Sequence, residues 1–171
     1  MLKYLLPVAC SLVNTHPRAF AQHNMPAGLS HDRHVAQLKE AALKERGRRA
    51  MGFDQDRTTH HFIVRPEGGI ISVEVNDPTD DTNRNAVRTH LERIAADFAA
   101  GRFDSPFATH GEEPPGTSAM RALRRSIRYV VERTAGGARV RMRSTNDAAI
   151  AAIHAFLAYQ IREHQTGDPL R

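Results

Sequence analysis

The sequence contains one local pattern twice, in which two β-rich runs are followed by a helix with an apolar stripe. The first copy occupies residues 60–77 and predicts a helix over about 82–100. The second copy occupies residues 127–147 and predicts a helix over about 147–164. Because such strands and helices have to bury their apolar faces against one another, this repeated order constrains the fold more than any other feature.

Each copy contains a glycine pair between its β-rich runs, Gly68-Gly69 and Gly136-Gly137. Glycine adopts the positive φ of tight hairpin turns, so we expect both pairs to form turns. The prediction is an α+β fold, with two ββα units forming a four-stranded, mainly antiparallel sheet, two long helices on one face and an N-terminal helix. The strand residues expected in the core are Phe62, Val64, Val73, Val75, Tyr129, Val131, Val140 and Met142, facing Val87, Leu91, Ile94, Phe98, Ile150, Ile153, Leu157 and Ile161 of the helices.

The two copies are joined by a linker over residues 101–123, which contains Pro106, Pro114 and Pro115. Proline disrupts helices and sheets, so we expect irregular structure until Ser118 starts a short helix toward Arg125. A connection of this length is often functional, although joining the two halves is a sufficient reason for it to exist.

Residues 1–21 have the features of a secretory signal peptide. Lys3 precedes an apolar run over residues 4–13, and Ala19-Phe20-Ala21 forms a small-x-small cleavage site. The run is shorter than the ~20 residues of a membrane span, so we expect a periplasmic or secreted protein without a transmembrane segment. A lipoprotein anchored through Cys10 is the alternative.

The chain after the signal peptide divides into a polar lead with a basic helix, over residues 22–52, and a compact α+β domain over residues 53–171. Ser30 can cap the basic helix, which continues toward Arg49. Cleavage removes Cys10, the one cysteine of the sequence, so stability has to come from burial and not from a disulfide. Removal of Lys3 and Arg18 with the signal peptide lowers the net charge from +5 to +3, a mild excess that together with secretion argues against nucleic-acid binding.

Several of the 10 histidines fall on faces that periodicity predicts to be apolar. His60 shares a strand face with Phe62 and should point toward the helices, whereas His61 should lie on the opposite face. His90 and His154 lie on the apolar stripes of the two long helices. Neutral imidazole is a good ligand for copper or zinc, although an inward histidine can also be a hydrogen-bonded core residue. The candidate metal ligands are His60, His61, His90 and His154, with His110 as an addition from the linker.

Two other classes of function stay open from the sequence. In an enzyme, His61, His110, Glu112, Glu113 and Asp54 could supply a general base and acid from loops at one end of the sheet. No nucleophile motif or phosphate-binding loop accompanies these residues. In an interaction module, alternating arginines of the second hairpin would form a basic outer sheet face, made of Arg128, Arg139, Arg141 and Arg143.

A second candidate metal site lies at the start of the mature chain. His23, Met25, His31 and His34 form a His/Met tract of the kind that captures copper in an oxidising compartment. His31 and His34 are three residues apart and would share a helix face. An unspecialised polar lead is the alternative.

Four stretches of the sequence resemble a family of small exported bacterial proteins. They are MGFDQDRTTHHF (51–62), VNDP (75–78), ATHGEEPPG (108–116) and FLAYQIREHQTGDP (156–169), and together they span nearly the whole domain. The resemblance implies export and brings no established activity. Some members carry an aspartate carbamoyltransferase label, but that enzyme is much larger and has a Ser-Thr-Arg-Thr phosphate loop where this chain offers only Arg143-Ser144-Thr145-Asn146.

Overall fold

The structure is a computed structural model that describes residues 27–170. The predicted signal peptide, the alternative lipidation site Cys10, and His23 and Met25 of the polar lead lie outside these residues. Within the described part of the chain, no helix is both long and apolar enough to cross a membrane.

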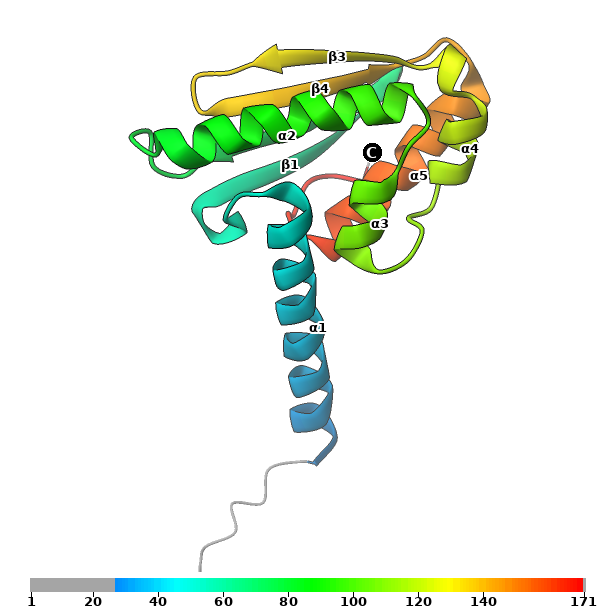
Figure 1. Ribbon diagram of the computed structural model, residues 1–171. Helices are drawn as coiled ribbons and strands as arrows, with labels where there is room; N and C mark the ends of the chain where they lie inside the picture. The colour runs from blue at the N-terminus through cyan, green and yellow to red at the C-terminus, as the bar shows by residue number, and fades with distance from the viewer. Residues whose placement is uncertain (1–26, 171) are drawn as a thin grey trace, which may run out of the picture.

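The described residues form a four-stranded sheet with five α-helices and two short 3-10 turns (Figure 1). All strand pairs are antiparallel, and the strand order is β1-β2-β4-β3. The predicted α+β fold, including its N-terminal helix, is therefore confirmed. The elements in chain order are α1 (Ala27–Met51), η1 (Gln55–Arg57), β1 (Thr58–Arg65), β2 (Gly68–Val75), α2 (Asp81–Ala99), α3 (Asp104–His110), α4 (Thr117–Ala122), η2 (Arg124–Ser126), β3 (Arg128–Arg133), β4 (Gly137–Arg143) and α5 (Asp147–Glu163).

The core forms where α2 and α5 pack against one face of the sheet. Every second residue of the central strands points to this face, as the alternation in their sequence predicts. Phe53 is the first residue after α1 that belongs to the hydrophobic core. The predicted core residues Val64, Tyr129 and Val131 are only partly buried, and Val75 and Ile150 lie at its margin. The buried members of the predicted set are Phe62, Val73, Val140, Met142, Val87, Leu91, Ile94, Phe98, Ile153, Leu157 and Ile161.

Side-chain caps explain why the two long helices begin close to their predicted positions. The Asp80 carboxylate accepts a hydrogen bond from the Asn83 amide at the start of α2. The Asn146 side chain accepts one from the Ala149 amide at the start of α5. Each cap satisfies a backbone N–H that the first helical turn leaves without a partner.

Of the four glycines predicted to form turns, only Gly136 lies in a turn, the one between β3 and β4. The β1–β2 turn consists of Pro66 and Glu67, so Gly68 and Gly69 belong to β2. A Cβ on Gly69 would overlap Leu157 of α5. Gly137 begins β4, and a Cβ there would overlap the backbone carbonyl of Val73. The prediction was wrong for Gly68, Gly69 and Gly137, which lie in strands, and close packing on the sheet explains the glycines at positions 69 and 137.

Replacement of Gly69 by alanine is expected to lower the free energy of unfolding by roughly 2 kcal/mol, because the added methyl group has no room beside Leu157. Gly136→Ala is the matched control, since Gly136 lies in the β3–β4 turn. A Cβ added there would lie 3.2 Å from its nearest neighbour, the Cβ atom of Glu74. We expect this control to change stability by about 0.5 kcal/mol or less. Urea denaturation measures both variants, and equal losses would contradict the packing explanation.

The linker is more regular than its three prolines predict. It contains the helix α3, which ends at Gly111 with a positive φ of 77°. Pro106 is the third residue of α3, in the first turn, where a missing backbone N–H breaks no intrahelical hydrogen bond. The expectation of irregular structure up to Ser118 was therefore wrong. The second helix of the linker, α4, begins at Thr117 and agrees with the prediction.

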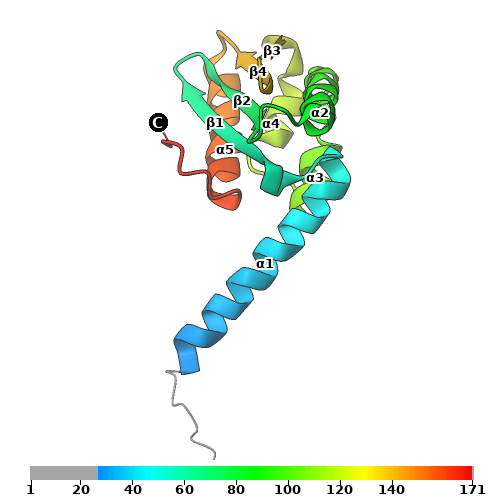
Figure 2. The same ribbon diagram turned by 90° about the vertical axis from the view of Figure 1, so that its left-hand side faces the viewer.

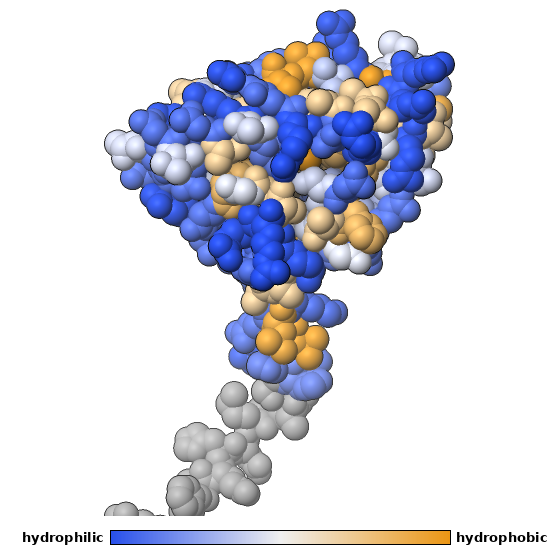
Figure 3. All heavy atoms as spheres, viewed as in Figure 1, coloured by the Kyte–Doolittle hydropathy of each residue, from blue (hydrophilic) through white to orange (hydrophobic). Residues whose placement is uncertain are grey.

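Helix α1 projects from the body, as Figures 1 and 2 show. Its last part is fixed to α3, where the Arg46 guanidinium donates hydrogen bonds to the backbone carbonyls of Thr109 and His110. Leu43 is buried, whereas Leu38, five residues earlier, is 57% exposed. The space-filling view shows apolar side chains on this projecting helix, below a largely hydrophilic body (Figure 3).

Candidate functional site

A small pocket between the sheet and the helices gathers four imidazoles. Its volume is about 60 Å³. His60 comes from β1, His90 from α2, His110 from the last residue of α3, and His164 from the residue that caps α5. The other lining residues are mostly apolar, and the remaining polar or sulfur-bearing ones are Met51, Ser105, Thr109 and Gln160.

The imidazole rings form a contiguous group. The His60 and His164 rings are stacked nearly parallel, with ring centres 5.7 Å apart and planes at 9°. The His110 and His164 rings meet edge to face at 5.2 Å. Phe53 separates His60 from His90, because it stacks on His60 at 5.7 Å and meets His90 edge to face at 5.6 Å. His164 is therefore the central ring of a group of three.

Burial keeps these imidazoles neutral. Loss of hydration lowers the pKa of His60 to about 4, and the neighbouring His61 adds a smaller effect in the same direction. Burial likewise lowers the pKa of His164 to about 3, with contributions from His60 and His110. Burial also lowers the pKa of His110. At neutral pH the lone pairs of the group are therefore not blocked by protons.

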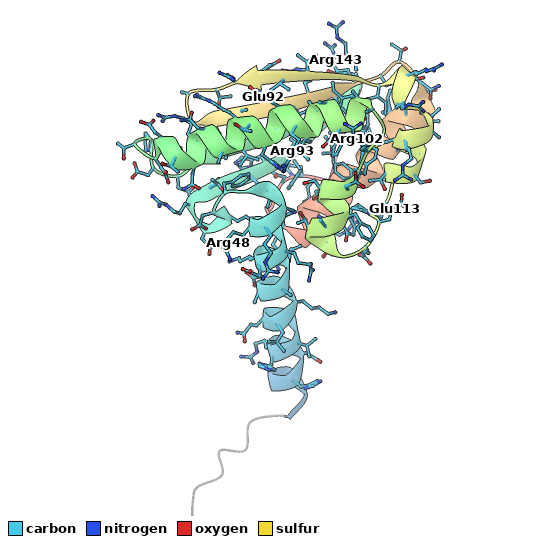
Figure 4. The ribbon with its side chains drawn as sticks, in the orientation of Figure 1. Arg48, Glu92, Arg93, Arg102, Glu113 and Arg143 are labelled. Atoms are coloured by element: carbon cyan, nitrogen blue, oxygen red, sulfur yellow. The ribbon has the colours of Figure 1, made fainter. Side chains whose placement is uncertain are left out.

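His90 differs from the other three because a cation holds its ring nitrogen. Burial lowers the pKa of His90 to about 3, and the Arg93 guanidinium is the second cause. Arg93 donates a hydrogen bond to His90 Nδ1 over 3.1 Å and another to the carbonyl of Ala50 over 2.7 Å. Figure 4 shows Arg93 extending from α2 toward the end of α1. Since Nδ1 accepts from Arg93, the proton of neutral His90 is on Nε2.

The pocket leaves three buried polar atoms without a hydrogen-bond partner: His60 Nε2, His110 Nδ1 and Gln160 Nε2. His110 Nε2 lies 3.0 Å from the amide oxygen of Gln160 and has to donate its proton to it. His110 Nδ1 therefore carries a free lone pair. An unpaired buried polar atom costs about 1 to 3 kcal/mol, so a bound water or ligand that paired with these three atoms would be stabilised.

Two wider hollows adjoin the pocket beneath α1, with volumes of about 420 and 530 Å³. Both are bordered by Leu43 of α1 and Glu163 of α5. His60 and His164 line the first hollow as well as the pocket, and His110 lines the second. The imidazoles thus lie between the apolar interior and space that is open to solvent.

The structure does not bring all five predicted metal ligands together. His60, His90 and His110 line the pocket, but His61 and His154 do not. His154 Nε2 donates a hydrogen bond to the backbone carbonyl of Arg65 at 2.9 Å, and the His154 side chain is partly exposed. It is adjacent to buried Ile153, and one helical step of ~100° turns it away from the core. The expectation that His154 faces inward therefore has to be corrected.

His61 lies outside the pocket and pairs with a carboxylate instead. Its Nδ1 lies 2.9 Å from Asp168 Oδ1, and its side chain is 50% exposed. The second oxygen of Asp168 accepts the backbone N–H of Phe62 at 2.8 Å. The Asp168 pKa is lowered, since hydrogen bonds from Thr166, Phe62 and His61 outweigh the opposing effect of partial burial. The ionised carboxylate therefore fixes His61 at the edge of the sheet.

Of the residues proposed for an acid-base enzyme, His110 and Glu112 line one hollow and the others lie elsewhere. Glu112 accepts a hydrogen bond from the Tyr159 hydroxyl at 2.7 Å, beside His110. Glu113 pairs with Arg121 and Thr117 at the start of α4. Asp54 caps the turn η1, and His61 lies on the other side of β1 from the pocket. His61 lines neither the pocket nor either of the two wider hollows, whereas His110 lines the pocket and one hollow.

Three of the four arginines predicted for the outer sheet face contact carboxylates. Arg139 and Arg141 both contact Glu132, at 2.7 and 3.2 Å. Arg143 lies 3.7 Å from Glu67 at the far end of the same face. An exposed pair of this kind contributes little to stability, and it also reduces the positive potential that a basic docking face would need.

The side-chain positions also bear on metal binding. In the described part of the chain, no group of three His, Cys, Asp or Glu side chains is arranged to hold a metal ion. The near-parallel stacking of His60 on His164 explains this, since stacked rings direct their nitrogens past each other.

In comparisons with known proteins, no family model, no curated protein and no solved structure matches the chain.

Sequence reasoning missed His164 and Gln160 as members of the site. His164 follows Ile161 by three residues, so helical periodicity already placed it on the inward side of α5. Gln160 had no comparable signal, because a buried glutamine is recognised only when its partner is known. That partner, His110, is 50 residues away in the sequence.

Proposed function

We propose that this chain is an exported binding protein for a transition-metal ion, copper or zinc, held by His60, His110 and His164. The observation that carries the proposal is the pair of buried imidazole nitrogens without partners, His60 Nε2 and His110 Nδ1, in one pocket with the central ring of His164. Neutral imidazole is the form that binds metals. The signal peptide predicted in residues 1–21 supports binding outside the cytoplasm.

The spacing of the rings suits a shared ion, although their orientation has to change. Metal–nitrogen bonds of about 2.0 to 2.1 Å place two imidazole centres roughly 5 to 6 Å apart when they bind one ion. The ring centres are 5.7 Å apart for His60 and His164, and 5.2 Å apart for His110 and His164. Rotation about the side-chain torsions would direct the nitrogens to one point, and the second torsion of histidine is soft.

Gln160 has a supporting role in this proposal. Metal-binding histidines usually donate their other ring N–H to a fixed acceptor, which sets the tautomer and the ring orientation. The Gln160 oxygen accepts from His110 Nε2 in this way. His110 Nδ1 is thereby held ready to bind an ion.

The test is metal titration of the metal-free protein and of a triple variant, His60→Gln, His110→Gln and His164→Gln. We expect the natural sequence to bind one ion per chain and the triple variant to bind at least about 100-fold more weakly. The matched control replaces His31, His34 and His154, which lie outside the pocket, and should bind as the natural sequence does. Circular dichroism establishes that each variant is folded, and the single variant His164→Gln provides the measurement if the triple variant is not. Undiminished binding in a folded pocket variant would rule out this site.

A further inference from the structure

We infer that two copies of this chain pair through the outer edge of β3, so that their four-stranded sheets join into one continuous sheet about a two-fold axis. The inference goes beyond the proposed metal binding and does not depend on it. It is carried by three features of β3: outward backbone groups without partners, apolar side chains that are only partly buried, and charges that match in one register.

The first feature is the free edge of β3. This strand has β4 as its single neighbour and forms the margin of the sheet in Figures 1 and 2. The Thr134 N–H donates to the Gly137 carbonyl at 3.0 Å, and this pair continues the β3–β4 register. Backbone groups alternate in direction along a strand, so those of Tyr129, Val131 and Arg133 point away from β4.

These outward groups have no partner within residues 27–170. The backbone hydrogen bonds outside the regular elements do not include Tyr129, Val131 or Arg133, and no side chain bonds to their backbone. At the other edge of the sheet, the outward N–H of Phe62 is bonded to Asp168. Of the two edge strands, β3 is therefore the one that is open to another strand.

The second feature is the partial burial of the apolar side chains of β3. Tyr129 and Val131 pack against the core but are only partly buried. Their neighbours on β4, Met142 and Val140, are fully buried because they have a strand on each side. Val130 is likewise only partly buried on the outer face. A strand added at this edge would cover all three exposed apolar side chains.

The third feature is the distribution of charge, which selects one register. Registers that keep the side-chain faces differ by steps of two residues. When Tyr129 lies opposite the partner's Val131, the two copies of Val130 meet on the two-fold axis. Arg128 then lies opposite the partner's Glu132, and the axis generates a second such pair. In the two neighbouring registers Glu132 lies opposite an uncharged residue, so both ion pairs are lost.

The backbone of β3 fits the same register. Tyr129 and Val131 both direct their N–H and C=O groups outward, so Tyr129 can exchange two N–H···O bonds with the partner's Val131. The two-fold axis repeats this pair with the roles of the copies exchanged. The register that matches the charges therefore also satisfies the free backbone groups at the centre of the edge.

Arg128 is the side chain that gains most from the pairing. Within its own chain it lies opposite Arg143 of β4, and directly opposed like charges are unfavourable. In the described part of the chain, no carboxylate contacts it. In each copy, Glu132 is already held by Arg139 and Arg141, so it loses little conformational freedom when a further arginine reaches it. Charges often protect an edge strand from pairing, but these charges are complementary about the two-fold axis.

Sedimentation at several protein concentrations measures the association. We expect a monomer–dimer equilibrium with a dissociation constant on the order of 10 µM, since a six-residue edge buries a small area. Arg128→Glu places two carboxylates opposite each other at both ends of the pairing and should weaken the dimer by about 10-fold or more. Arg65→Glu is the matched control, because Arg65 is exposed on the same sheet face at the end of β1. Circular dichroism establishes that both variants are folded.

Hydrogen exchange of backbone amides in the natural sequence locates the interface without any substitution. The amides of Tyr129 and Val131 should exchange about 10-fold more slowly at about 1 mM protein than at about 1 µM, because pairing protects them. The Val130 amide points to β4 and should be protected at both concentrations. This readout distinguishes pairing through β3 from association through any other surface.

A chain that is monomeric at about 1 mM would overturn the inference. A dimer in which the Tyr129 and Val131 amides exchange as fast as in the monomer would also overturn it. Protection of both amides in a monomeric chain would do the same, because a segment of the same chain would then cover the edge. Equal weakening by Arg128→Glu and Arg65→Glu would reject the register. None of these outcomes alters the result of the metal titration, which concerns the pocket between the sheet and the helices.

Discussion

Acidification of the metal-free protein from pH 7 to pH 4.5 is expected to lower its free energy of unfolding by about 3 to 5 kcal/mol. The cause is the group of buried imidazoles. In the folded protein the pKa values of His90 and His164 are about 3, against the usual 6.5. Below pH 6.5, each of these two histidines lowers the free energy of unfolding by about 1.36 kcal/mol per pH unit. Their electrostatic coupling through His60 makes the combined loss smaller than the sum of the two.

The direction follows from proton uptake. Below pH 6.5 the unfolded chain protonates these histidines, whereas the folded chain does not until the pH approaches their lowered pKa values. Because the unfolded state binds more protons, stability falls as the pH falls, from about 6.5 toward about 3. Above pH 7 both states are neutral at these positions, so the imidazoles should add no pH dependence there.

Urea denaturation at several pH values measures this effect. The variant His90→Gln should show a shallower decline between pH 6.5 and 4.5, because one buried titrating group has been removed. His31→Gln with His34→Gln should follow the natural sequence, since both residues are exposed on α1. A midpoint that does not change from pH 7 to 4.5 would contradict the burial of neutral imidazoles.

Replacement of Phe98 by alanine is expected to cost about 4 kcal/mol of the free energy of unfolding. Phe98 is 1% exposed, and its ring contacts Phe103 at 4.5 Å, Phe156 at 5.7 Å and Tyr129 at 6.1 Å between ring centres. It therefore joins α2 to α5, to β3 and to the linker. Truncation would leave a cavity that several elements would have to collapse together to fill.

The control for Phe98 is Phe107→Ala, since the Phe107 side chain is 55% exposed on α3. We expect this variant to stay within about 0.5 kcal/mol of the natural sequence. Denaturation in urea at pH 7 and low salt measures both variants. Similar losses in the two variants would show that the aromatic cluster around Phe98 is not the centre of the core.

The main elements of the fold could be predicted because their signals are local. The two long helices have apolar stripes of period 3.6 and begin at Asp80 and Asn146, which are common capping residues. The positions that were predicted wrongly depend on neighbours far away in the sequence. Gly69 is a glycine because Leu157 passes over it, and α3 tolerates Pro106 because the ring falls in its first turn.

The candidate site was predictable only in part, for a related reason. Strand alternation placed His60 on the helix side, and helical periodicity placed His90 inward. Periodicity cannot state which inward residues meet. His164 reaches His60 and His110 because the end of α5 packs between β1 and α3, whereas His154, on the same helix, meets the end of the β1–β2 hairpin.

The Asp168 carboxylate on the backbone of β1 has a consequence for contacts between copies of the chain. β1 is an edge strand, and an unpaired strand edge is a template for adding strands of another molecule. Asp168 occupies the outward N–H of Phe62 and places a negative charge there. An incoming strand would have to displace this carboxylate and its histidine partner before it could pair. The residues after α5 thus act as a cap against strand-to-strand aggregation along this side of the sheet.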